Sequence, residues 1–290
     1  MIRLTFVFNG IHLEAARRLR RRATPDSSSR RHWSMPVLQV LVLEGSRLCL
    51  ERDDRQLWPL RLRIQPVVMA VLALFTTLGL VAEVRLPHLR GAGRALRWLV
   101  RRCPRLFLLD DGLDQYRGQP RALDPGCFPP GTPLALFSDQ RESRAPWCER
   151  FHVLELGPLY RAAPGSGAPP AGAHPGSLIV DSPGVERLMA MGYELPRPWQ
   201  LIPHPVRSKR SWPLPCEITP AGSEVQIALE QRIARFSGLI VVGESMALLA
   251  ALALRPAGSP LLVALPPSSD PHLRALVTRL ASRDPAVSLA

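Results

Sequence analysis

Two short motifs in this sequence contain side chains that are suited to acid–base chemistry. Asp110-Asp111-Gly112 follows the apolar run 106–109, and His204-Pro205 follows the run 201–203. In open α/β sheets, ligands bind beyond the carboxyl ends of the strands, which is where both motifs are predicted to lie. A carboxylate there can take a proton from a substrate hydroxyl, and an imidazole can donate one to an anionic leaving group.

Each motif also has a simpler interpretation. An aspartate pair after a strand is typical of a turn or helix cap, and a histidine in a loop often has no chemical role. Gly112 permits a tight turn or a close backbone approach, while Pro205 favours an extended His204. Two adjacent carboxylates can raise the pKa of one of them, which would suit a general base.

A third motif, Gly243-Glu244-Ser245, follows the predicted strand 239–242 and opens a predicted helix over 245–254. Ser245 is predicted to be the N-cap of that helix, and helix N-termini bind phosphate groups through backbone N–H groups. A plain N-cap fits the same residues. Glu244 would have to point away from any bound anion, because two negative charges repel each other.

The chain is strongly basic, with 37 Lys and Arg against 24 Asp and Glu and a formal net charge of +13. Such a charge attracts polyanions, which include nucleic acid, anionic lipid and phosphorylated substrates. Thirteen arginines fall into two blocks, residues 17–31 and 90–105, which a solvated face would also explain. A third block lies just after His204-Pro205 and supplies candidate anion contacts, namely Arg207, Lys209 and Arg210.

Several classes of site have no support in the sequence. The five cysteines form no CxxC pair, the histidines have no metal-ligand spacing, and neither a P-loop nor a GxSxG motif is present. The first strand is followed by Asn9-Gly10-Ile11 and not by the glycine-rich loop of dinucleotide-binding folds. The sequence therefore predicts no bound metal or cofactor and a cytoplasmic protein with reduced thiols.

Residues 67–82 are almost wholly apolar. A helix of this length would span only about 25 Å, less than the hydrocarbon core of a bilayer. We therefore expect a helix that is buried between a sheet and the surface and does not span a membrane.

Periodicity predicts alternating strands and helices, typical of an α/β fold with helices on both faces of parallel sheets. The Ala-, Pro- and Gly-rich stretch 162–176 is predicted to be a linker. It would join an N-terminal Rossmann-like domain, residues 1–161, to a C-terminal one, residues 177–290. The expected strands are 2–8, 37–43, 47–50, 81–86, 106–109, 177–180, 200–202, 239–242 and 261–265, and the expected helices are 13–22, 67–82, 91–102, 184–191, 224–234, 245–254 and 271–281.

Taken in this order, the three motifs resemble those of bacterial sialyltransferases of the lipooligosaccharide and capsule polysialyltransferase families. These families share an acidic-acidic-Gly motif, a His-Pro motif and a Ser-containing phosphate motif. The stretch Leu113-Asp114-Gln115-Tyr116 also resembles the continuation of their acidic motif. The resemblance implies a GT-B fold, in which two Rossmann-like domains with parallel sheets face a central cleft.

The resemblance also implies a function and roles for residues. Asp111 would be the base that deprotonates an acceptor hydroxyl, with Asp110 and Gly112 shaping its loop. His204, next to Pro205, would assist the departure of CMP, and Ser245 with Gly243 would hold its phosphate. The reaction would be an inverting, metal-independent transfer of sialic acid from CMP-sialic acid to a glycan or glycolipid. The basic blocks would also allow a cytoplasmic protein to attach peripherally to the inner membrane, although an inert surface would explain them equally well.

Other functions remain open at this point. One is a GT-B transferase with a different nucleotide donor. The family pairs hydroxyl residues where this chain has Glu244 before Ser245, so an inactive relative is a further alternative. The last is a basic, non-catalytic protein that binds anionic lipid or nucleic acid through its arginine blocks, although we do not expect nucleic acid to be the partner.

Overall fold

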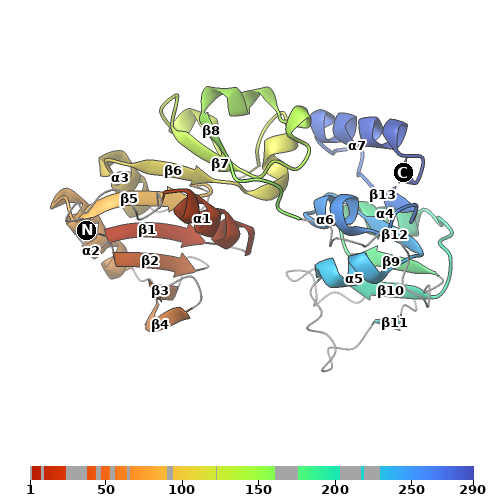
Figure 1. Cartoon of the computed structure of the whole chain (residues 1–290), viewed down its shortest axis with the longest axis horizontal. Helices are drawn as coiled ribbons and strands as arrows, with labels where there is room; N and C mark the ends of the chain where they lie inside the picture. Colours follow the sequence, from red (N-terminus) through yellow and green to blue (C-terminus); the bar gives the residue numbers. More distant parts are fainter. Residues whose placement is uncertain are drawn as a thin grey trace, which may run out of the picture. The chain divides into compact units, whose positions relative to one another are not determined.

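The computed structural model describes residues 2–7, 10–23, 38–43, 47–52, 56–63, 66–89, 94–121, 123–160, 176–202, 217–218 and 229–290. The chain divides into two compact units, Met1–Gly157 and Pro158–Ala290 (Figure 1). Of the predicted linker, only Gly176 is among the described residues. Each unit has its own sheet and its own apolar core.

Unit 1 contains an eight-stranded sheet in the order β4-β3-β2-β1-β5-β6-β7-β8. The strands β2, β3 and β4 pair antiparallel, whereas β2, β1, β5, β6, β7 and β8 are parallel. The bounds are β1 (Ile2–Val7), β2 (Leu38–Leu43), β3 (Arg47–Arg52), β4 (Gln56–Arg63), β5 (Val81–Leu86), β6 (Leu106–Leu109), β7 (Pro133–Leu136) and β8 (His152–Glu155). The strands β4, β7 and β8 were not predicted, because β4 and β7 contain a proline and β8 has a polar residue at each end.

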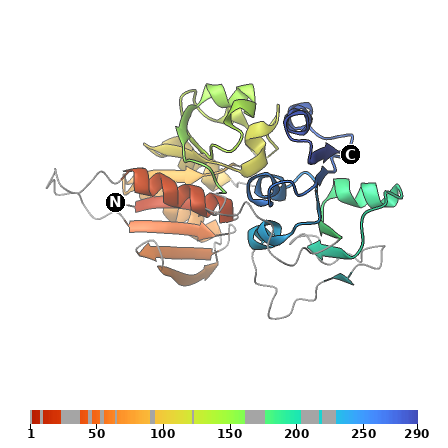
Figure 2. The same ribbon diagram turned by 45° about the vertical axis from the view of Figure 1, so that its right-hand side comes forward.

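The helices of unit 1 cover both faces of this sheet, as predicted. The helix α1 (Gly10–Ala23) follows β1 and packs along it (Figures 1 and 2). The helices α2 (Pro66–Thr77) and α3 (Arg94–Arg102) pack against each other. Side chains alternate along β1 and β5, so that Leu4, Phe6, Val84 and Leu86 join the apolar core with α2 and α3.

The face under α1 carries buried charges instead. Arg85 is fully buried, and its Nε donates to Glu83 Oε1 at 2.5 Å while its Nη1 donates to Ala16 O of α1 at 3.1 Å. Arg3 Nε lies 3.0 Å from the same Glu83 oxygen. Burial lowers the pKa of Arg85, and Glu83 opposes that shift. These contacts hold α1 against the sheet. They also pair each buried charge with a partner, and an unpaired charge at this place would be strongly destabilising.

The apolar segment 67–82 differs from its prediction. The helix ends at Thr77, and β5 begins at Val81. Leu72 and Thr76 are buried, but Val71 is 42% and Leu74 is 55% exposed. The prediction of a buried helix is therefore wrong for one side of α2. In the part of the chain that the structure describes, no helix is long and apolar enough to cross a membrane.

Unit 2 contains a parallel six-stranded sheet in the order β11-β10-β9-β12-β13-β14. Its strands are β9 (Ser177–Val180), β10 (Trp199–Ile202), β11 (Glu217–Ile218), β12 (Leu239–Val242), β13 (Leu261–Val263) and β14 (Val287–Leu289). Its helices are α4 (Pro183–Ala190), α5 (Leu229–Arg235), α6 (Ala247–Leu254) and α7 (Pro271–Arg283). The short strands β11 and β14 were not predicted.

The helix starts in unit 2 follow familiar capping rules in two cases. Ser182 caps α4 by accepting from Val185 N at 3.4 Å, and Asp270 caps α7 by accepting from His272 N at 2.8 Å. Both helices have proline in their first turn. The α/β class is thus confirmed, with a parallel sheet in unit 2 and a mainly parallel one in unit 1, and two Rossmann-like domains are compatible with it. The GT-B arrangement, which concerns how two such domains face each other, stays a prediction.

Candidate functional site

The candidate site of unit 1 lies at one edge of its sheet. Because β1, β5, β6 and β7 are parallel, the loops after them leave the sheet at the same edge. The strand β2 lies on one side of β1, whereas β5 to β8 lie on its other side. The strand order therefore reverses between β1 and β5, and α/β sheets bind ligands at such a topological switch point. His12, in the first turn of α1, follows β1, and the loops carry His88 after β5, Asp110 and Asp111 after β6, and Phe137 after β7.

Asp110 is the anchor of the loop after β6. It is 1% exposed and accepts three hydrogen bonds, from Gly112 N at 2.6 Å, Gln115 Nε2 at 2.8 Å and Phe137 N at 2.8 Å. Burial raises the pKa of Asp110 to about 7, although the backbone N–H groups of Phe137 and Gly112 act in the opposite direction. The capping interpretation of the aspartate pair therefore fits Asp110, which is a structural residue.

The turn that follows is held rigidly. Gly112 has φ +80°, a left-handed conformation that glycine adopts readily, and it begins a 3-10 helix, Gly112–Tyr116. Gln115 Oε1 accepts from Arg144 Nε at 2.9 Å, and the Tyr116 hydroxyl donates to Asp139 O. The loop after β6 is thereby tied to the loop after β7.

Arg144 is the centre of this network. Its Nη2 donates to Phe137 O at 2.8 Å, and its guanidinium makes a bidentate pair with Glu155 at 2.6 and 2.9 Å. The hydrogen bond from Arg144 holds the pKa of Glu155 below its usual range. Such a bidentate pair fixes the orientation of the guanidinium and also neutralises its charge. Arg144 thereby holds Gln115 and Phe137, which both donate hydrogen bonds to Asp110, in place.

Asp111 has a different environment from Asp110. It is the N-cap residue of the 3-10 helix, but its side chain makes no capping hydrogen bond. Instead its Oδ1 lies 2.6 Å from Nε2 of His12, a residue 99 positions earlier in the chain. When the imidazole carries its proton on Nε2, His12 donates this hydrogen bond to the carboxylate.

The two members of this pair differ in burial. The side chain of His12 is 1% exposed, whereas that of Asp111 is 18% exposed. The ring of His88 lies edge-on to that of His12, with 6.2 Å between the centroids. The order from core to solvent is therefore His12 and then Asp111, and the carboxylate is the member that can reach a ligand.

Only some of the predicted site residues of unit 2 are among the residues that the structure describes. His204, Pro205, Arg207, Lys209 and Arg210 lie outside the described residues, so the predicted meeting of Asp111 with His204 stays a prediction.

Gly243, Glu244 and Ser245 are described, and they follow β12 as expected. Gly243 lies so close to Ser182 that an added Cβ would come within 1.9 Å of its Oγ.

The prediction that Ser245 is an N-cap is wrong. The helix α6 begins at Ala247 with Met246 as its N-cap residue, and no side chain caps it. Ser245 Oγ is buried and has no hydrogen-bond partner among the described residues. Glu244 Oε2 lies 3.3 Å from Ser269 Oγ, so its carboxylate is directed toward Ser269.

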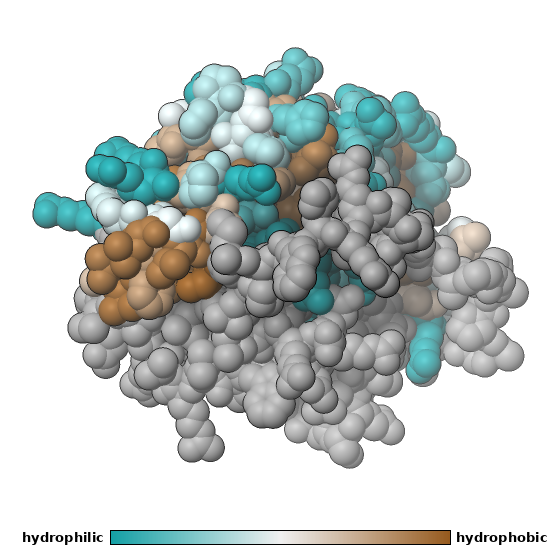
Figure 3. Space-filling view, turned by 60° about the vertical axis from the view of Figure 1, so that its left-hand side comes forward, coloured by the Kyte–Doolittle hydropathy of each residue, from teal (hydrophilic) through white to brown (hydrophobic). Residues whose placement is uncertain are grey.

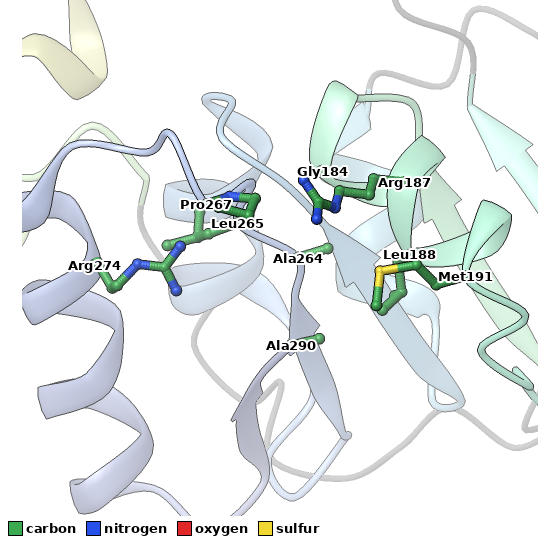
Figure 4. A pocket seen from close by; sticks show the side chains of 9 residues that line it. All are labelled: Gly184, Arg187, Leu188, Met191, Ala264, Leu265, Pro267, Arg274 and Ala290. Carbon is green, nitrogen blue, oxygen red and sulfur yellow. The ribbon is translucent and has the colours of Figure 1, made fainter.

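Unit 2 also contains a cavity of about 420 Å³ beside the start of α4 (Figure 4). Arg187 of α4 and Arg274 of α7 extend toward it from opposite sides, and Leu188, Met191 and Leu265 supply apolar lining. Arg274 also donates to Pro266 O at 2.9 Å. Two guanidinium groups over an apolar wall suit an anion that has an apolar part. This cavity was not predicted.

Sequence reasoning missed His12, Gln115 and Arg144. His12 was discounted because it has no metal-ligand spacing, yet it lies just beyond the first predicted strand, where the argument used for Asp111 applies equally. Gln115 and Arg144 act through contacts that link separate loops, which no local pattern reveals. Among the described residues, no group of three or more His, Cys, Asp or Glu side chains is placed to hold a metal ion.

Comparisons with protein-family models, with curated proteins and with solved structures return no match for this chain.

Proposed function

We propose that this protein is a glycosyltransferase that transfers sialic acid from CMP-sialic acid to a hydroxyl group of a glycan acceptor, with inversion. The observation that supports this most is the placement of Asp111, a partly exposed carboxylate on a rigid strand-end loop with a buried histidine behind it. The sialyltransferase identity itself comes from the order of the three motifs in the sequence.

The order of burial favours a carboxylate base over a histidine base. In a Ser-His-Asp arrangement the aspartate is buried and the imidazole faces the substrate. Here the imidazole of His12 is buried and the carboxylate of Asp111 faces outward. A carboxylate in that position can accept the proton of an acceptor hydroxyl, which is the task of the base in a glycosyl transfer.

The proposed step balances as follows. The acceptor hydroxyl gives its proton to Asp111, and its oxygen forms the new bond to the anomeric carbon of sialic acid. The bond between that carbon and the phosphate oxygen of CMP breaks, and CMP leaves as an anion. His204 would donate a hydrogen bond or proton to that phosphate.

Unit 2 offers groups that suit an anionic donor. Ser245 Oγ, buried and without a partner among the described residues, can donate to a phosphate oxygen. Arg187 and Arg274 at the cavity of unit 2 can pair with a phosphate or a carboxylate, both of which CMP-sialic acid carries. Glu244 Oε2 accepts a hydrogen bond from Ser269 Oγ, which supports a carboxylate that is directed away from the anion.

The test is an assay of nucleotide release and sugar transfer with the full chain and a panel of glycan acceptors. We expect CMP-sialic acid to be used and UDP- and GDP-sugars to be refused. Asp111→Asn should lower kcat by about 100-fold or more, since general bases contribute on that order. Asp124→Asn, at an exposed aspartate of the same unit, should retain wild-type turnover.

Other outcomes have distinct meanings. Turnover with a UDP- or GDP-sugar that depends on Asp111 would identify a different donor and disprove the sialyl assignment. Absence of turnover with every donor, in a folded protein that binds CMP, would identify an inactive relative.

A further inference from the structure

We propose that one surface of unit 1, formed by α2 and α3, binds to the surface of an anionic lipid bilayer. We call it the α2–α3 surface and define it by exposed apolar residues and by the arginines beside them. The apolar members are Val71, Leu74, Leu78, Leu80 and Trp98. The basic members are Arg94, Arg97, Arg101, Arg102 and Arg105.

The apolar part of the surface is unusual for an exposed helix. Leu74 is 55% and Leu78 is 62% exposed, although aliphatic side chains of this size normally pack inward. They are neighbours along one side of α2 and its following turn, because residues four apart share a helix face. Figure 3 shows an apolar patch, in brown, with pale and then hydrophilic side chains, in teal, above it. Contiguous exposed apolar side chains of this kind mark an interaction site.

The charge on α2 and α3 themselves has one sign. The segment 66–82 contains no charged residue, and α3 contains four arginines and no acidic residue. All four of these arginines are exposed, and so is Arg105 just beyond α3. Because α2 and α3 pack against each other over the same core, their exposed side chains adjoin on one side of the sheet of unit 1.

This combination fits a lipid surface better than a nucleic acid. Single strands are bound through aromatic stacking platforms, and duplexes through polar contacts to base edges and phosphates. The exposed apolar residues here are mainly Leu and Val, which suit acyl chains. Trp98 lies at the border with Arg102, whose guanidinium carbon is 5.6 Å from the ring centroid, and tryptophan prefers the headgroup level of a bilayer.

The proposed occupant is therefore a bilayer rich in acidic headgroups. The leucines would enter the boundary between headgroups and acyl chains, and the arginines would pair with lipid phosphates. The inference does not depend on the proposed enzymatic function, since a catalytically inactive protein would bind in the same way. It also gives a physical role to the basic block over residues 90–105.

The test is flotation of the full chain with vesicles of phosphatidylcholine that contain 30% phosphatidylglycerol, and with vesicles of phosphatidylcholine alone. We expect binding to the first kind only. Leu74→Ser with Leu78→Ser should reduce binding at least tenfold, and each substitution of Arg97 or Arg101 by Gln should reduce it about fivefold. These side chains are exposed, so the substitutions should not unfold the protein, and far-UV circular dichroism checks this.

The controls remove the same chemistry from unit 2. Arg279→Gln with Arg283→Gln removes two exposed charges from α7, and Met191→Ser removes a side chain that is 73% exposed. Both should leave vesicle binding unchanged. A second readout is quenching of tryptophan fluorescence by brominated lipid, which should be reduced by Trp98→Phe.

Three results would overturn the proposal. The first is equal binding to both kinds of vesicle, or none to either. The second is equal loss in the α7 control, which would indicate attraction by net charge alone. The third is a dimer in sedimentation experiments that Leu74→Ser with Leu78→Ser dissociates, without any vesicle binding, which would make a second copy of the chain the occupant.

Discussion

The replacement Asp110→Asn should destabilise the protein by an amount that falls as the pH rises. The pKa of Asp110 is raised to about 7, whereas an unfolded aspartate has a pKa near 3.8. The folded state therefore binds the proton more tightly than the unfolded state. Its contribution to stability is complete below about pH 4 and is lost as the pH rises through about 7.

The magnitude follows from these two values. Between pH 5 and pH 8, the wild-type protein should lose about 2–3 kcal/mol of unfolding free energy through Asp110, and the asparagine variant should lose none of it. A second contribution is independent of pH. Asparagine has one carbonyl oxygen for three N–H donors, so at least one donor is left facing the amide NH₂, which costs about 1–3 kcal/mol.

The assay is urea denaturation of the full chain at pH 5 and pH 8, followed by tryptophan fluorescence, with Asp124→Asn as the control. The loss caused by Asp110→Asn should be larger at pH 5 by about 2–3 kcal/mol. The exposed control should show no such difference. A loss that is larger at pH 8 would mean that the three hydrogen bonds outweigh burial and keep the carboxylate ionised, which would refute the reasoning.

Three further predictions concern the loop and its surroundings. Gly112→Ala forces alanine to φ +80° and should lower the unfolding free energy by about 1–2 kcal/mol and remove most of the turnover. The control Gly131→Ala, at φ +76° in open space, should lower stability by a similar amount and leave kcat unchanged, and equal turnover in both variants would contradict the assigned role of the loop. Arg144→Lys cannot keep the guanidinium contacts and should lower the unfolding free energy by about 2 kcal/mol in urea denaturation, whereas an unchanged midpoint would count against the network. Burial raises the pKa of Cys148 to about 12, so peptide mapping after thiol labelling of the native protein at pH 8 should find the exposed Cys127 modified and Cys148 protected; rapid labelling of Cys148 would show that its surroundings open.

The parts of the fold that rest on periodic segments or on unbroken apolar runs could be predicted from the sequence. The strand β1 and the helices α1 and α7 bury a repeating set of apolar side chains, and β6 and β12 are runs of four apolar residues, so all five are near their predicted positions. The strands β7, β8 and β14 are equally short or shorter, and a proline or polar residue interrupts each apolar run. Their existence depends on pairing with neighbours that lie far away in the sequence.

The candidate site was predictable only in its exposed half. The position of Asp111 after a buried strand followed from the local pattern. The separate roles of the two aspartates did not, because they depend on which carboxylate meets Phe137 N and which meets His12. The error at α2 has a similar cause. Its sequence is apolar on every side, so it does not indicate which side packs against the core and which side is exposed.

The most direct test of the central claim, that Asp111 is the base of the transfer, is a double-mutant cycle on kcat with His12, whose buried ring contacts Asp111 and should orient it. The variants are His12→Phe, Asp111→Ala and the two combined, with His12→Gln as the conservative replacement that can still donate a hydrogen bond. We predict that His12→Phe lowers kcat about tenfold, that His12→Gln restores most of it, and that His12→Phe has no further effect once Asp111 is alanine. Independent losses that multiply in the double variant, or wild-type turnover in Asp111→Ala, would contradict the account.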